Sequence, residues 1–301
     1  MSDKPAGPEI GAEDPAEMTL LHQPDPEAET VVAPRTIVLR PNVLLSCGYY
    51  TNVGQKRKMN QDSLFTLQAV KVNQSDSFPL GLYVVADGMG GQAAGEIASG
   101  LVVSVLAHRA QTELFKYFTE EVIAGAQINE WLRTALEAAN QAVIEGRAAR
   151  ENDMGSTVVV AVVLDTTAYL AHVGDSRAYR ISLEGEIERL TLDHSLVEQL
   201  VLAKQITASE ARTHKRRNIV YRTMGEKENV EVEINQIPLG IGDRLVLCSD
   251  GLNSMIEDSH IAAIVQGAPS LMDAARRLVD AANTAGGEDN ITAVVIEVAA
   301  L

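Results

Sequence analysis

Five short segments of the chain share one pattern, in which an apolar strand is expected to end in an aspartate that is followed by a small or polar residue. A buried carboxylate is unfavourable unless it is paired or binds a metal ion. A single Asp-Gly is typical of a turn in which the carboxylate caps backbone amides. Five at equivalent strand ends instead predict that the carboxylates converge at one end of the sheets around a shared counter-charge. The five residues are Asp62, Asp87, Asp175, Asp250 and Asp289.

The expected counter-charge follows from the type of ligand. These segments supply oxygen atoms alone, and the sequence has no cysteine or histidine cluster at zinc spacing. Carboxylate and carbonyl oxygens suit Mg²⁺ or Mn²⁺ better than zinc. The sequence therefore predicts a site for Mn²⁺ or Mg²⁺.

The elements that must position these aspartates can be predicted from the hydrophobic pattern. In residues 128–150 apolar side chains recur at three- and four-residue steps, which predicts a helix with one buried stripe. Strand runs joined mainly by tight turns and interleaved with helix pairs predict antiparallel sheets covered by helices. We expect strands at 43–47, 64–70, 82–86, 157–164, 168–173, 178–182, 187–191, 230–236, 244–249 and 291–298, and helices at 93–110, 128–150, 258–266 and 271–283.

Composition limits the class of protein. The 301 residues are 46% hydrophobic, enough for a large buried core. The net charge of −16 argues against a nucleic-acid partner, because binding a polyanion needs a basic surface. The most apolar run, 158–164, is far shorter than the roughly 20 residues that cross a bilayer, so we expect no membrane span. Two cysteines, Cys47 and Cys248, without a signal peptide predict a reducing, cytoplasmic compartment.

The chain is expected to have two parts. Residues 1–36 contain six prolines, scattered acids and no sustained hydrophobic period, which predicts a disordered acidic tail. Residues 37–301 are predicted to form one domain. Within it, the polar and mostly helical stretch of about 195–224 stands apart from the strands around it.

Seven motifs occur in the order and approximate spacing of a known family. On these residues, the chain from about residue 45 to residue 298 resembles the metal-dependent type 2C protein serine/threonine phosphatases, also called the PPM family, and specifically its bacterial branch. The motifs are Arg57-x-x-Asn60-Gln61-Asp62, Asp87-Gly88-Met89-Gly90-Gly91, Gly155-Ser156-Thr157, Gly174-Asp175-Ser176-Arg177, Asp193-His194-Ser195, Ser249-Asp250-Gly251-Leu252 and Asp289-Asn290.

The resemblance implies a fold and a site. The fold would be α+β, a four-layer α/β/β/α sandwich of two antiparallel sheets flanked by helices, with residues 195–224 as a flap subdomain. Two cations, Mn²⁺ or Mg²⁺, would be bound, and a third, weaker site is possible. The metal ligands would be Asp87, which bridges both cations, the carbonyl of Gly88, Asp250 and Asp289, with Asp175 at the third site.

The resemblance also implies the chemistry. Arg57 would bind the substrate phosphate and Asp62 would act on the attacking water, so that Arg57, Asp62 and Asp87 form the catalytic set. Three ligand aspartates would repel a phosphate until two divalent cations reverse the local charge, and the planar fork of an arginine suits phosphate oxygens. Many eukaryotic relatives have a histidine where this chain has Met89, which cannot transfer a proton. The acid is then expected to be water on the metals, with His172 and His194 as weaker candidates.

The most favoured function is therefore a phosphoprotein phosphatase that hydrolyses phosphoserine and phosphothreonine with a metal-activated water and no phosphoenzyme. Its partners would be phosphorylated proteins, substrates of a serine/threonine kinase in signal transduction, and the enzyme would be a monomer. A catalytically silent regulatory protein of the same fold remains an alternative, although it would require the loss of a ligand that is present here. A hydrolase of small phosphorylated metabolites is a further alternative, which the sequence does not separate from the first.

Overall fold

The computed structural model describes residues 36–38, 43–73, 76–91, 94–118 and 122–301. The chain divides into two units, Met1–Ala33 and Pro34–Leu301. The predicted acidic tail lies outside the described residues except for its last position, and it stays a prediction.

Two antiparallel sheets form the centre of the second unit. One contains β2 (Val43–Asn52), β9 (Arg177–Ile181), β10 (Ile187–Arg189), β12 (Arg244–Cys248) and β13 (Ile291–Ala300), in the order β10-β9-β12-β13-β2. The other contains β3 (Asp62–Asn73), β4 (Asp76–Met89), β7 (Val158–Leu164), β8 (Thr167–Val173) and β11 (Glu233–Pro238), in the order β11-β8-β7-β4-β3, and β6 (Gly155–Ser156) pairs with β4. A further pair joins β1 (Thr36–Val38) to β5 (Val122–Ala124).

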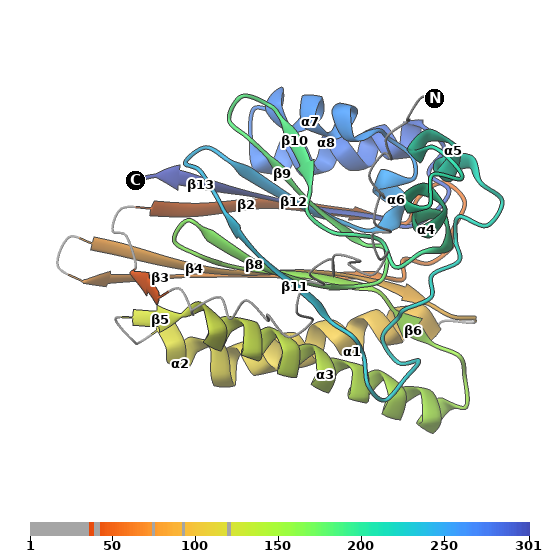
Figure 1. Ribbon diagram of the computed structural model, residues 1–301, viewed down its shortest axis with the longest axis horizontal. Helices are drawn as coiled ribbons and strands as arrows, with labels where there is room; N and C mark the ends of the chain where they lie inside the picture. Colours follow the sequence, from red (N-terminus) through yellow and green to blue (C-terminus); the bar gives the residue numbers. More distant parts are fainter. Residues whose placement is uncertain (1–35, 39–42, 74–75, 92–93, 119–121) are drawn as a thin grey trace, which may run out of the picture. The chain divides into compact units, whose positions relative to one another are not determined.

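Helices cover the outer faces of both sheets (Figure 1). The six-stranded sheet is covered by α1 (Ala94–Arg109) and α3 (Gly125–Arg150), with a π-helical turn (Ala110–Leu114) and α2 (Phe115–Phe118) between them; the five-stranded sheet is covered by α7 (Asp258–Gln266) and α8 (Leu271–Thr284). Three short helices, α4 (Leu196–Leu202), α5 (Ala208–Thr213) and α6 (Asp250–Asn253), lie together near one end of the sheets. The predicted four-layer α+β sandwich is thus confirmed.

Strand β7 shows why the layers hold together. All seven of its residues are buried, because successive side chains of a strand point to opposite faces. Val158, Val160 and Val162 pack with the helices of one layer, while Val159 and Ala161 pack into the core between the two sheets. Full burial of a valine or leucine side chain contributes roughly 1.5–3 kcal/mol, so this strand stabilises both interfaces of its sheet.

Several predicted boundaries were wrong for physical reasons. Helix α3 begins at Gly125 instead of residue 128, because the Gln127 side chain accepts a hydrogen bond from the Ala124 amide at 2.8 Å and caps the helix before its apolar stripe begins. Strand β11 is shifted from 230–236 to Glu233–Pro238 by its pairing with β8. The strands β1 and β5 were not predicted. No helix among the described residues combines the length and apolar character that a bilayer span requires.

Candidate active site

The five aspartates lie at element ends, as expected, but not all of them end a strand. Asp87 is near the end of β4, and Asp175 follows β8. Asp62 instead begins β3, where it is the register partner of Asp87 in the antiparallel pair. Asp250 begins α6 directly after β12, and Asp289 precedes β13. In an antiparallel sheet the start of one strand lies beside the end of its neighbour, so both kinds of terminus supply carboxylates to the same site.

Asp62 is held by hydroxyl groups from the other sheet. Its Oδ2 accepts hydrogen bonds from Ser249 Oγ and from Thr292 Oγ1, each at 2.7 Å. Its Oδ1 is buried and has no hydrogen-bond partner among the described residues. Burial raises the pKa of Asp62 to about 7, the two hydroxyl bonds oppose this shift, and the charges of Asp250 and Asp289 add to it. The carboxylate is oriented through one oxygen and free to act through the other.

The neighbouring carboxylates destabilise one another without a cation. Burial raises the pKa of Asp250 to about 6, with repulsion by Asp289 as the next cause. Burial also raises the pKa values of Asp87 and Asp175 well above the usual range, and the charge of Asp250 raises both further. Asp250 Oδ1, like the free oxygen of Asp62, is buried without a partner in the described part of the chain. Such a cluster is the environment in which a bound cation offsets the cost of burying negative charge.

Gly88 allows the backbone of the site to pack closely. A Cβ atom at this position would lie 2.0 Å from the carbonyl oxygen of Gly95 and 2.7 Å from that of Gln61. The Gly88 amide donates to the Gln61 oxygen at 3.1 Å. Any side chain here would therefore push β4 away from the start of α1 and displace Asp87 beside it.

Arg57 lies beside this cluster. Its Nη2 donates to Asp289 Oδ2 at 2.6 Å, and its side chain is 48% exposed. The hydrogen bond to Asp289 is the largest cause of a raised pKa for Arg57, and the charges of Asp250 and Asp87 add to it. The guanidinium thus faces the carboxylates from the solvent side.

Asn290 connects the two loops that carry Arg57 and Asp289. Its side-chain amide donates to the carbonyls of Val53 and Met59, both at 2.9 Å, and its Oδ1 accepts from the Gln61 amide at 2.8 Å. The motif match included this residue without giving it a role. Only its position after Asp289 could have suggested one, because its partners lie more than 200 residues away.

A cavity of about 310 Å³ opens over the cluster. Five arginines line it, and each faces an acid: Arg57 pairs with Asp289, Arg177 with Asp193, Arg189 with Glu198 and Arg217 with Glu288, while Arg212 lies 3.9 Å from Asp258. Of the acids that line the cavity, two have no such partner among the described residues. They are Asp175 and Asp250, both from the predicted ligand set.

Arg177 is held away from a phosphate-binding role by its own contacts. Its guanidinium makes three hydrogen bonds of 2.6–3.1 Å to Asp193, and its Nη1 donates to the Tyr179 hydroxyl at 3.0 Å. Because both partners are buried, this pair fixes the end of β9 against the segment that leads into α4.

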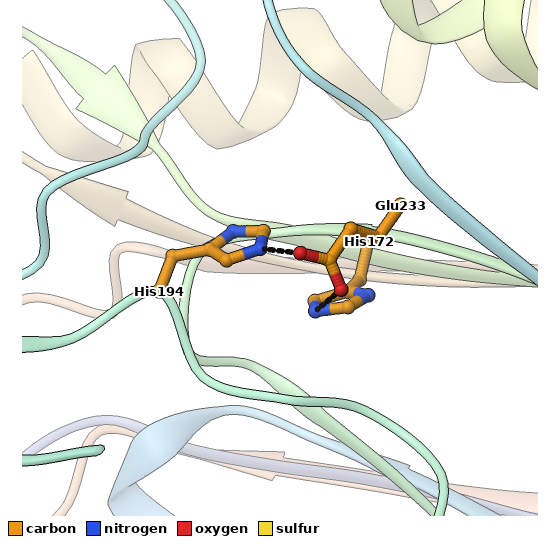
Figure 2. A group of neighbouring side chains, drawn as sticks. All are labelled: His172, His194 and Glu233. Atoms are coloured by element: carbon orange, nitrogen blue, oxygen red, sulfur yellow. Dashed lines mark hydrogen bonds and ion pairs between the residues drawn. The ribbon is translucent and has the colours of Figure 1, made fainter. Parts of the chain in front are cut away.

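His172 and His194 do not line the cavity. Their rings stack with centroids 4.8 Å apart, and Figure 2 shows both directed toward Glu233. His194 Nδ1 accepts from the Gly174 amide at 3.0 Å, which places its proton on Nε2, 2.8 Å from Glu233 Oε1. Burial lowers the pKa values of both rings. This geometry disfavours either histidine as the acid for the leaving group.

The same three side chains are a poor metal site. Their potential ligand atoms lie within 4.8 Å of one another, but His172 Nε2 is 2.9 Å from the Leu192 carbonyl, which favours a proton there. Arg222 Nη1 lies 2.9 Å from His194 Nε2 and 3.3 Å from Glu233 Oε1. An arginine in this position already supplies the positive charge that a metal ion would bring.

A cluster of carboxylate oxygens with an adjacent arginine, set at one end of a double antiparallel sheet, defines a metal-dependent hydrolase of phosphate esters. The model of the protein phosphatase 2C family matches residues 53–293, and the chain belongs to this family. It is 37% identical over 247 residues to protein phosphatase PhpP of Streptococcus pneumoniae, a match that covers 82% of this chain and 94% of the relative.

Solved structures agree with this assignment. The serine/threonine phosphatase of S. agalactiae superposes with a TM-score of 0.72 at 32% identity and covers 84% of this chain and 99% of its own. The catalytic domain of the serine/threonine protein phosphatase PstP, in complex with two manganese ions, gives a TM-score of 0.70 at 31% identity and covers 85% and 99%.

Proposed function

We propose that the protein hydrolyses phosphoserine and phosphothreonine side chains of other proteins by direct attack of water, with divalent cations held by the aspartate cluster. The class, a serine/threonine phosphatase of the 2C type, follows from the family and from relatives named as such.

The residues present fit a divalent cation. Buried carboxylate oxygens of Asp62 and Asp250 have no partner in the described residues, and the donor set consists of hard oxygens. Asp87 and the Gly88 carbonyl would hold the first cation, and Asp87, Asp250 and Asp289 would hold the second. Asp175 is assigned to a third, weaker site. When bound, Mn²⁺ or Mg²⁺ lowers the pKa of the attacking water and neutralises charge on the phosphate.

Arg57 is proposed to bind the phosphate. An arginine carries five N–H donors in a planar fork, and only one of them is engaged by Asp289 in this structure. The remaining donors can bond two phosphate oxygens together, which orients the ester for in-line attack. Its half-exposed position over the cavity is what supports this role.

Asp62 is proposed to hold or accept the proton of the attacking water at Oδ1. The two hydroxyl donors fix the carboxyl group through Oδ2, and Oδ1 is left unpaired. A carboxylate that is fixed through one oxygen and free at the other can act as a general base on a water molecule beside the free oxygen. Met89 has no proton to give, so the leaving oxygen takes its proton from water in the cavity.

The observation that carries the proposal is that every arginine in the cavity faces an acid, while Asp175 and Asp250 form no ion pair with any described residue. The direct test is release of phosphate from a phosphothreonine peptide with and without Mn²⁺. Free phosphorylated metabolites in the same assay separate a protein phosphatase from a small-molecule hydrolase. Hydrolysis of neither substrate by the Mn²⁺-loaded protein would support the regulatory alternative.

The setting of the reaction is also a proposal. A kinase that phosphorylates serine and threonine must supply the substrate, so the protein would act in signal transduction in the cytoplasm, as a monomer. Gel filtration with light scattering measures the oligomeric state. The flap subdomain at 195–224 contributes part of the cavity wall, which supports a role in admitting substrate.

A further inference from the structure

One wall of the cavity is apolar and comes from the flap. Val197 and Val201 of α4, one helical turn apart, and Ala208 and Ala211 of α5 all line it. Residues three or four positions apart share one face of a helix, so both helices present their small apolar face to the same space. We call these four residues the flap wall.

The flap wall is anchored at its α4 end. Glu198 accepts two hydrogen bonds from Arg189 of β10 and is almost buried. The Ser195 hydroxyl caps the helix by accepting from the Glu198 amide at 3.3 Å. Since Val197 and Val201 lie on this short helix, the wall has a fixed position beside the catalytic aspartates.

Among the described side chains, the rest of the cavity has no unpaired cationic group that could bind an acidic residue next to the phosphorylated one. Each of the five lining arginines already faces an acid, and among the described residues no lysine lines the cavity. An acidic residue beside the phosphothreonine would have to compete with these acids for an arginine. A charged or polar side chain against the flap wall would lose water without gaining a partner, which is unfavourable.

We propose that the flap wall selects phosphoproteins that carry an apolar residue next to the phosphorylated threonine or serine. This inference rests on the proposed function and names its substrate class. The cavity volume of about 310 Å³ lies at the small end of ligand pockets, which run from roughly 300 to 1,000 Å³. It accommodates the phosphorylated side chain and one neighbour of modest size.

The test uses three phosphothreonine peptides that differ only in the two residues flanking the phosphothreonine: valine, aspartate or lysine. We expect kcat/KM for the valine peptide to exceed that for the aspartate peptide about 10-fold, the lower end of the range for one methylene group in a hydrophobic pocket. Equal rates on all three peptides, or faster hydrolysis of the aspartate peptide, would overturn the inference and leave the phosphatase function standing. Failure to hydrolyse any of the peptides, with p-nitrophenyl phosphate still hydrolysed, would overturn the protein-phosphatase function itself.

Substitutions then assign the preference to the wall. Val201→Thr replaces a methyl with a hydroxyl at nearly constant shape, and Ala211→Ser adds a single oxygen. Both should bring the valine-to-aspartate ratio toward one, and because the ratio compares two substrates on one enzyme, a general loss of activity cancels. The control is Leu202→Thr, at a neighbouring side chain that is 59% exposed and does not line the cavity. A ratio that changes equally in the control, or that survives both wall variants, would refute the assignment.

Discussion

Replacing Asp62 by asparagine should stabilise the metal-free protein, and more so at high pH. Burial raises the pKa of Asp62 from 3.8 to about 7. A group whose pKa is raised on folding favours the protonated folded state, so its ionisation costs stability as the pH rises from 3.8 through 7. From 1.36 kcal/mol per pKa unit, this cost is on the order of 2 kcal/mol at pH 5 and on the order of 4 kcal/mol at pH 8.

Asparagine is a suitable replacement because its amide oxygen can still accept the hydroxyls of Ser249 and Thr292. Urea unfolding in EDTA at pH 5 and pH 8 should show that the stability difference between Asp62→Asn and the unsubstituted protein grows by about 2 kcal/mol between the two pH values. Any pH-independent effect of the amide cancels in this comparison. A stability difference between the two proteins that is the same at both pH values, or larger at pH 5, would refute the idea that burying the ionised Asp62 carboxylate destabilises the folded protein.

Further predictions follow from the same site. Millimolar Mn²⁺ should raise the melting temperature because it binds the folded state, and Asp250→Ala should abolish this rise. An unchanged melting temperature of the unsubstituted protein would contradict the assignment of the aspartate cluster as a metal site. Arg57→Ala should raise KM more than it lowers kcat, with about one to two decades lost in kcat/KM, whereas Asp87→Ala should abolish turnover at any substrate concentration. An unchanged KM would show that Arg57 does not bind the substrate phosphate. Asp175→Ala should impair phosphopeptide hydrolysis more than that of p-nitrophenyl phosphate, whose leaving group needs no proton; equal losses would reject the third-site role.

The five aspartates could be selected from the sequence because each is marked locally, and their roles stay a prediction. A carboxylate beside an apolar run is visible in a few residues, and the order of the motifs supplied the family. The two residues that bond Asp62 have no such local signal in the sequence. Ser249 and Thr292 are ordinary strand-end hydroxyl residues until the two sheets stack, and only then do they lie 2.7 Å from the carboxylate.

The flap wall could not be predicted from the sequence for a related reason. Val197 and Ala211 lie on helices of seven and six residues, too short for a hydrophobic period to show which face is covered. The position of α4, which carries Val197, is fixed by the ion pair between Arg189 and Glu198, a tertiary contact between two elements. The helix start at Gly125 was missed because a side-chain cap leaves no apolar signal.

The bonds around Asp62 join residues that are far apart along the chain. Thr292 lies 230 positions after Asp62, and Ser249 lies 187 positions after it. The partner strand of β2 is β13, an interior strand that lies between β2 and β12. Nearly the whole domain must therefore leave the ribosome before the carboxylates can come together. Until then, Asp62 and Asp87 have been synthesised but their partners near the end of the chain have not. A chain that ends before Asp289 and Thr292 lacks part of the site, so catalytic activity reports that the last strand, β13, has joined its sheet.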